Sequence, residues 1–140
     1  MADAATTEVA PGDAAEAALA FLGEMSPDLR GGAILDAGGA VLAASGDPER
    51  WQEDAAALFT VADRAADEPA EQLHIATEQG EVFALRHAGF AVVVVTERFA
   101  LASLMFFDIR STLRDLAAAC RQVENPPLGG KIGPSTPEEA

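Results

Sequence analysis

Five glycines between residues 31 and 46, in the stretch GGAILDAGGAVLAASG, invite comparison with a phosphate-binding loop. A P-loop needs Lys and then Ser or Thr directly after its last Gly, because the ammonium group must reach the β- and γ-phosphates. No Lys follows any of these glycines, since Lys131 is the only Lys in the chain, and the dinucleotide pattern GxGxxG is also missing. We therefore interpret the stretch as a β-hairpin, in which the apolar runs 33–35 and 41–43 flank an Asp-Ala-Gly-Gly turn at 36–39.

The other side chains that could perform chemistry stand apart in the sequence. His74 and His87 have no Cys, Asp or Glu at the spacing of metal ligands, and Ser45 and Ser103 lack the GxSxG context of a nucleophile elbow. Cys120 falls on the apolar stripe of a predicted helix, where it is expected to act as a small hydrophobic residue. We expect a protein that is not an enzyme, with no catalytic, cofactor-binding or metal-ligating residues.

The overall charge narrows the class of partner. The chain carries 23 acidic and 9 basic residues, for a formal net charge of −14, which repels nucleic acid and anionic membrane surfaces. Its longest apolar run, 90–95, is far shorter than the roughly 20 residues that span a membrane. The acidic N-terminus does not resemble a secretory signal, and a single Cys fits a reducing compartment. We expect a cytoplasmic location.

Charge is distributed unevenly along the chain. Residues 47–71 hold eight acids and two arginines, and we interpret the acids as a solvated helix face rather than a catalytic carboxylate pair. Residues 98–121 instead hold four arginines and two aspartates. Within them Phe107, Arg110 and Arg114 form a basic strip with an aromatic residue, which predicts a partner-binding surface. The alternative, an ordinary solvated helix face, stays open.

The pattern of apolar residues and turn signals predicts one folded domain over residues 13–124. A disordered acidic leader at 1–12 and a disordered Pro/Gly tail at 125–140 are expected to flank it. Capping signals predict helices that begin at Asp13 and at Asp47-Pro48, and a third helix runs to residue 123. The expected order is a helix from 13, the hairpin, a helix over 47–67, strands over 72–78, 81–88 and 90–96, and a helix over 100–123. This α+β order, αββαβββα, predicts one five-stranded antiparallel sheet with helices on both faces.

The middle helix and the strand after it suggest a dimer. At 100° per residue, one stripe of the helix is apolar, with Phe59 and Ala66 at its edge; its members are Trp51, Ala55, Leu58, Ala62 and Ala65. Ala57 and Val61 form a smaller apolar ridge beside it, which allows a second helix to approach closely. Strand 72–78 is expected to be an exposed sheet edge, and such an edge needs cover. We predict a homodimer interface that includes Ala57, Val61, Leu73 and Ile75.

The element order resembles the roadblock / dynein light chain family. The segments that carry the resemblance are GAILDAGGAVLAASG (32–46), VFALRHAGFAVVVVTE (82–97) and TERFALASLMFFDIRSTLRDL (96–116). The resemblance extends over about residues 13–123 and implies the roadblock-like, profilin-like αββαβββα fold. It also implies dimers that join two sheets edge to edge and set the two middle helices side by side.

The family resemblance implies a function without catalysis. Bacterial proteins of this type act as partners or regulators of Ras-like small GTPases, and eukaryotic ones serve as dynein light chains or scaffolds. The family has no shared catalytic residues, so none is assigned here. We expect a homodimeric adaptor or regulator that binds a small GTPase or another signalling protein. The alternative is a small-molecule sensor domain, which would need polar anchors in an interior that is mainly Ala and Val.

Overall fold

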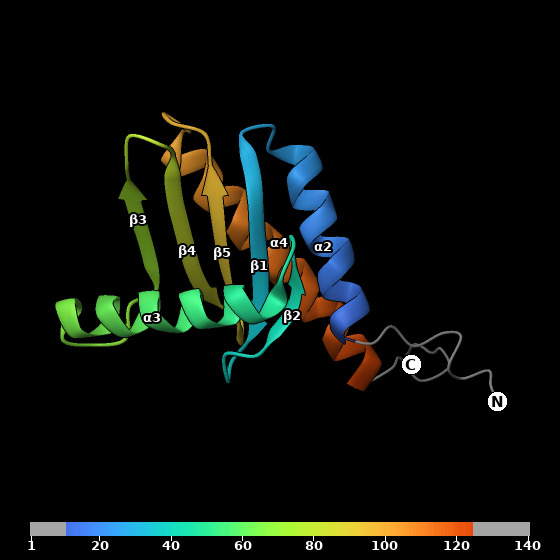
Figure 1. Cartoon of the computed structure of the whole chain (residues 1–140). Coiled ribbons are helices and arrows are strands. Elements are labelled where there is room, and N and C mark those ends of the chain that lie inside the picture. The colour runs from blue at the N-terminus through green and yellow to red at the C-terminus, as the bar shows by residue number, and fades with distance from the viewer. Residues whose placement is uncertain (1–10, 125–140) are drawn as a thin grey trace, which may run out of the picture.

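The computed structural model describes residues 11–124, which form eight elements around one sheet (Figure 1). These elements are α2 (Pro11–Met25), β1 (Leu29–Asp36), β2 (Val41–Ala44), α3 (Pro48–Ala66), β3 (Gln72–Ala76), β4 (Glu81–His87), β5 (Phe90–Thr96) and α4 (Ala102–Glu124). The predicted order αββαβββα is confirmed. The predicted leader and tail lie outside the described residues, apart from residues 11 and 12, which belong to α2.

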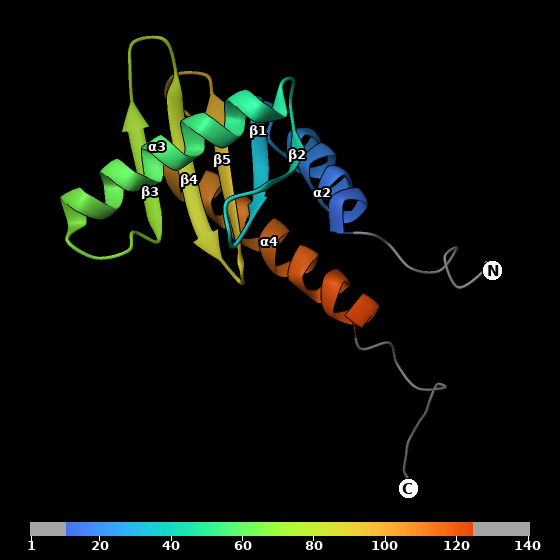
Figure 2. The ribbon, with the colours of Figure 1, turned by 60° about the horizontal axis from the view of Figure 1, so that its bottom comes forward.

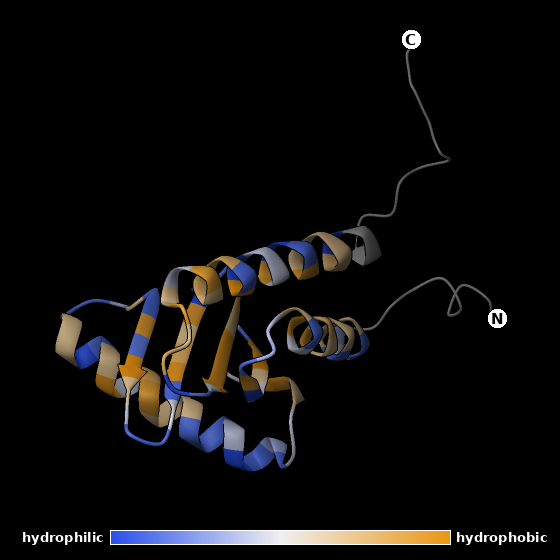
Figure 3. Cartoon of the chain, turned by 90° about the horizontal axis from the view of Figure 1, so that it is seen from above, coloured by the Kyte–Doolittle hydropathy of each residue, from blue (hydrophilic) through white to orange (hydrophobic). Residues whose placement is uncertain are grey.

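The sheet is antiparallel throughout, with strand order β2-β1-β5-β4-β3. Helices α2 and α4 cover one face and α3 covers the other, as the view along the sheet shows (Figure 3). β1, β5 and β4 are interior strands, so their side chains alternate between two cores. Ile34, Val92 and Val94 face α2 and α4, whereas Ala33 and Val93 face α3. The predicted fold class, with helices on both faces, is confirmed.

The glycine-rich stretch forms the β1–β2 hairpin. Asp36 Oδ1 accepts hydrogen bonds from the N–H groups of Gly38 and Ala40 at 2.9 and 3.0 Å, and Gly39 takes a φ of 93°. Gly32 serves a different purpose, because a Cβ there would lie 2.8 Å from Val94 Cγ1. The glycines thus shape a turn and allow close packing of strands.

Helix α3 begins where the sequence predicted. Asp47 caps it by accepting the Glu49 N–H at 3.0 Å, and the helix ends at Asp67 in the left-handed conformation. Its burial differs from the predicted stripe, because Phe59 is buried at the centre of the contact while Ala65 is exposed. The Arg86 guanidinium lies 4.1 Å from the centre of the Phe59 ring and covers it, so this Phe packs under a cation rather than at the edge of the core.

The two outer helices differ from their predicted details. α2 begins at Pro11, so Asp13 lies in its first turn and is not the cap. Ala17 and Ala20 are exposed, because α2 turns Ala15 and Leu22 inward. α4 begins at Ala102 rather than at the predicted residue 100, and its buried residues include Leu113 and Ala117. Cys120 is half-buried at the margin of this core.

Candidate functional site

The residues that could perform chemistry are not brought together. Among residues 11–124 no three His, Cys, Asp or Glu side chains group as metal ligands would. His87 lies at the end of β4, while His74 lies on β3. The Ser45 carbonyl accepts the Trp51 indole N–H at 2.7 Å, and Ser45 Oγ accepts the Gly32 N–H at 3.2 Å. None of the helices within these residues combines the length and apolar character that a membrane crossing requires.

The two edges of the sheet are protected differently. β2 is only four residues long, its pairing with β1 shifts register between Ile34 and Leu35, and both α2 and α3 pack against it. β3 is five residues long and pairs regularly with β4 along its length. Four of its five residues are exposed. Since a regular, uncovered edge strand invites another strand, β3 is the edge that can accept a second chain.

An apolar groove lies beside α3, on the face of the sheet that α3 covers. It has a volume of about 440 Å³, and its apolar lining, which we call the α3 groove, consists of Trp51, Leu58, Val82, Val93 and Val95. Asp47, Arg50 and Asp54 stand at its rim. Helix α3 covers only part of this face, and its last turns project past β3 (Figures 1 and 2).

The predicted dimer residues lie on α3 and on β3, and none of the four lines the groove itself. At 100° per residue Val61 falls on the same flank of α3 as Leu58, and it is 65% exposed. Ala57 is also exposed. On β3 both Leu73 and Ile75 point to the α3 face, where Leu73 packs half-buried on the core and Ile75 is 38% exposed. The four residues therefore share one side of the molecule.

A second exposed apolar surface lies on the opposite side, around the start of α4. We call its residues, Phe99, Leu101, Leu104 and Phe107, the α4 surface; all four side chains are more than half exposed. Of the predicted partner-binding residues, Phe107 belongs to this surface, and Arg110 and Arg114 follow it along the helix, half-buried and exposed respectively. Sequence reasoning missed the other three, although residues 101, 104 and 107 repeat every third position away from the buried stripe through Met105 and Ile109.

A buried carboxylate connects the edge strand to this surface. Glu81, only 6% exposed, lies 2.6 Å from His74 Nε2 through one oxygen and accepts the Phe99 N–H with the other. The hydrogen bond from His74, followed by the bond from Phe99, lowers the pKa of Glu81 against the opposing effect of burial. His74 also stacks on Phe83, with ring centres 4.3 Å apart. The sequence does not signal this arrangement, because its members come from β3, β4 and the loop before α4 and meet only when the strands pair.

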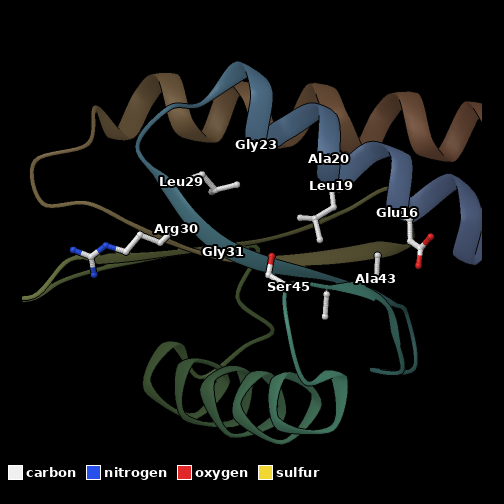
Figure 4. A pocket seen from close by; sticks show the side chains of 10 residues that line it. Glu16, Leu19, Ala20, Gly23, Leu29, Arg30, Gly31, Ala43 and Ser45 are labelled. Atoms are coloured by element: carbon white, nitrogen blue, oxygen red, sulfur yellow. The ribbon is translucent and has the colours of Figure 1, made fainter.

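A further groove, of about 410 Å³, lies between α2 and the β1–β2 edge (Figure 4). Leu19 and Leu29 line its middle, with Glu16 and Arg30 toward its ends. Arg30 is already bound to both oxygens of Glu97 at 2.9 Å, and this pair lowers the pKa of Glu97. The polar side chains of the groove are exposed, so it lacks the buried anchors that orient a small ligand.

Comparison with known proteins identifies the fold. No protein-family model matches the sequence, and no curated protein sequence matches it. Among solved structures, a roadblock/LC7 domain from Streptomyces avermitilis is 16% identical with a TM-score of 0.63, over 76% of this chain and 97% of that one. The gliding protein MglB from Thermus thermophilus is 17% identical with a TM-score of 0.60, over 81% and 93%. Profilin IA from Acanthamoeba castellanii is 16% identical with a TM-score of 0.51, over 78% and 98%. The protein therefore has the roadblock/LC7 fold, as its sequence predicted.

Proposed function

We propose that this protein is a homodimeric, non-catalytic adaptor or regulator that binds a Ras-like small GTPase. The observation that carries the proposal is that the α3 groove, which reaches Val82 on the strand next to β3, and the β3 edge are both open on one molecule. A monomer would leave this groove, the β3 edge and Val61 in water together, which is unfavourable for both the apolar side chains and the strand.

A second copy of the chain would cover the groove, the β3 edge and Val61 together. Antiparallel pairing of two β3 strands places a two-fold axis through the joined edge, so each contact occurs twice. Because α3 projects past β3, its last turns would then lie over the partner's sheet, on the side where the α3 groove is open. Val61 and Ala57 would lie between the two helices. These relations support the interface predicted from Ala57, Val61, Leu73 and Ile75.

The GTPase assignment comes from the resemblance to the roadblock / dynein light chain family, and MglB, whose fold this chain shares, is named a gliding protein. The scattered positions of His74, His87 and Ser45 support a role without catalysis. Phe107, Arg110 and Arg114, which we propose bind the partner, lie on the face opposite the α3 groove. The proposed dimer therefore leaves them accessible. The small-molecule sensor alternative gains no support from the grooves, whose polar side chains are exposed.

A binding experiment with defined proteins tests the assignment. The full chain would be mixed in turn with each Ras-like GTPase encoded in the same genome, loaded with GDP or with a non-hydrolysable GTP analogue. We expect one of them to bind with an affinity that depends on the nucleotide, and the chain alone to hydrolyse no GTP. Failure to bind any of them in either nucleotide state would contradict the proposal.

A further inference from the structure

We propose that the α4 surface binds an acidic amphipathic segment of a partner protein, whose apolar side chains cover Phe99, Leu104 and Phe107 and whose carboxylates pair with nearby arginines. The inference rests on the proposed adaptor function and assigns the chemistry of the partner at that site.

The exposure of this surface is not a consequence of an unfinished core. On this face α4 already buries Met105, Ile109 and Leu113 against the sheet, and α2 packs beside it. Yet Phe99 is 82% exposed and Phe107 is 64% exposed. A group of exposed large apolar side chains beside a completed core is typical of a protein-binding site.

Helix α2, which packs against α4, also exposes large apolar side chains. Ser26 Oγ donates to Asp108 Oδ2 at 3.2 Å, which joins the end of α2 to the second turn of α4. Phe21 and Met25, on the preceding turns of α2, are 52% and 38% exposed. Two neighbouring helices that each expose apolar side chains can bind the apolar face of a third helix or segment.

The position of Phe99 is enforced by the fold. Its φ is +65°, in the left-handed region that a bulky residue rarely adopts. Its N–H is held by the buried carboxylate of Glu81, which His74 binds from β3. An exposed aromatic in a strained conformation with a buried anchor indicates a functional contact. Glu81 is a positioning residue here, because it acts on the surface only through Phe99.

The charge around the surface selects an acidic partner. The ion pairs formed within residues 11–124 involve Arg30, Arg50 and Arg86 among the arginines. None of these ion pairs uses the three arginines that border the α4 surface, although acidic residues outnumber basic residues by 23 to 9 in the whole chain. These three are Arg98, Arg110 and Arg114. Arg98 lies over the Phe99 ring, with 4.6 Å from its guanidinium carbon to the ring centre.

The same charges disfavour two other occupants. If two copies met through this face, their arginines would oppose one another across the two-fold axis, which costs several kcal/mol when such like charges are desolvated. An anionic membrane would be repelled by the net charge of −14. The net charge also repels an acidic segment, but a short segment contacts only the residues around the three arginines, whereas a membrane surface faces much more of the acidic chain.

Photo-crosslinking in the native cells tests this inference with the full chain. The variant Phe107→p-benzoylphenylalanine places a light-activated aromatic group at the centre of the surface, and the crosslinked peptides are then sequenced by mass spectrometry. We expect a peptide from another protein in which several Asp or Glu flank Leu, Ile or Phe. A crosslink to this chain itself, to lipid, or to a basic peptide would overturn the inference, and so would the lack of any crosslink.

Charge variants show whether the arginines select the partner. Arg110→Glu with Arg114→Glu should reduce the crosslink from position 107 by at least about tenfold, whereas Arg110→Lys with Arg114→Lys should retain most of it. Thermal melting verifies that each variant is folded. Equal crosslinking by the Glu and Lys variants would also overturn the inference.

A second crosslinking position separates this inference from the proposed dimer. The variant Val61→p-benzoylphenylalanine places the same group on α3, on the opposite face of the sheet. If the proposed dimer forms, this group should crosslink to a second copy of the chain. Loss of the self-crosslink at 61 would contradict the proposed dimer alone. Loss of the acidic-peptide crosslink at 107 would contradict the inference drawn here.

Discussion

The two faces of the sheet are covered to different extents. On one face α2 and α4 lie side by side over a core that contains Phe83, Leu85, Ile109 and Leu113, all fully buried. On the other face α3 alone covers a core with smaller side chains and leaves the α3 groove open. Both faces nevertheless expose apolar residues, Val61 on one and Phe107 on the other.

This difference shows that exposed apolar side chains can have two origins. Beside α3 they border a groove and an open strand, so a second copy of the chain would complete the core. On α4 they stand above a complete core and beside arginines that form no ion pair within residues 11–124, so they indicate a different protein. The contrast assigns a different proposed partner to each face, so that mutations can test the two proposed interfaces separately.

Removing the largest buried side chain of the α2/α4 face should have the largest effect on stability. Phe83 is fully buried, stacks on His74 and meets the Phe106 ring edge-on at 5.3 Å. Phe83→Ala should lower the free energy of unfolding by about 3–5 kcal/mol, from lost burial and the cavity left behind. Urea denaturation measures this loss. A loss below about 1 kcal/mol would show that this face is not the principal core.

A charge on the flank of α3 should separate the dimer. Val61→Arg would place two arginines against each other across the two-fold axis, at a cost of several kcal/mol, and should yield a monomer or an aggregate. Thr60→Arg is the matched control, because Thr60 is exposed on the other side of α3 and is close to Val in size. It should change stability by less than about 0.5 kcal/mol and preserve the dimer. Sedimentation velocity distinguishes the two variants, and a dimeric Val61→Arg protein of unchanged stability would place the interface elsewhere.

A carboxylate on each face shows how a partner from another element lowers a pKa. Asp63 on α3 accepts from Arg86 at 2.9 Å and from the Ala70 N–H at 2.9 Å, and these bonds lower its pKa. On the other face His74 and Phe99 lower the pKa of Glu81. Because each folded-state pKa lies below its unfolded value, the stabilisation is complete above the unfolded pKa, near 4, and is lost as the pH falls through the folded value.

Stability should therefore decrease as the pH is lowered below about 4.5. Asp63→Asn and Glu81→Gln should each lower stability at pH 7. Each should also make the loss of stability between about pH 4.5 and 2.5, the acid limb of the profile of stability against pH, less steep. Thermal melting between pH 2.5 and 7 measures both. An acid limb as steep in both variants as in the native chain would contradict the assigned roles of these pairs.

The smallest effect is expected from removing the chain ends. Residues 1–10 and 125–140 have no apolar periodicity in the sequence, so their deletion should shift the melting temperature by less than about 2 °C. Calorimetry of the trimmed chain tests this. A larger decrease would mean that one end covers the α3 groove or the α4 surface, which would remove the contrast drawn between the two faces.

Local signals explain why so much of the fold could be predicted. The Asp47-Pro48 start of α3 and the Asp36 turn each depend on a few neighbouring residues, so the sequence shows them directly. The exposed β3 edge was also predicted correctly. The site was less accessible, because Glu81, His74 and Phe99 meet only after the strands pair. Phe59 was misplaced for a similar reason, since the Arg86 that covers it comes from another element.

The mass of the full chain in solution tests the central claim most directly, namely that a second copy completes the α3 face. Light scattering at tens of micromolar, where an interface of standard size should be occupied, should give twice the chain mass of 14.5 kDa. A mass of 14.5 kDa throughout that range would contradict the claim, because the α3 groove and the β3 edge would then remain open in the stable form of the protein.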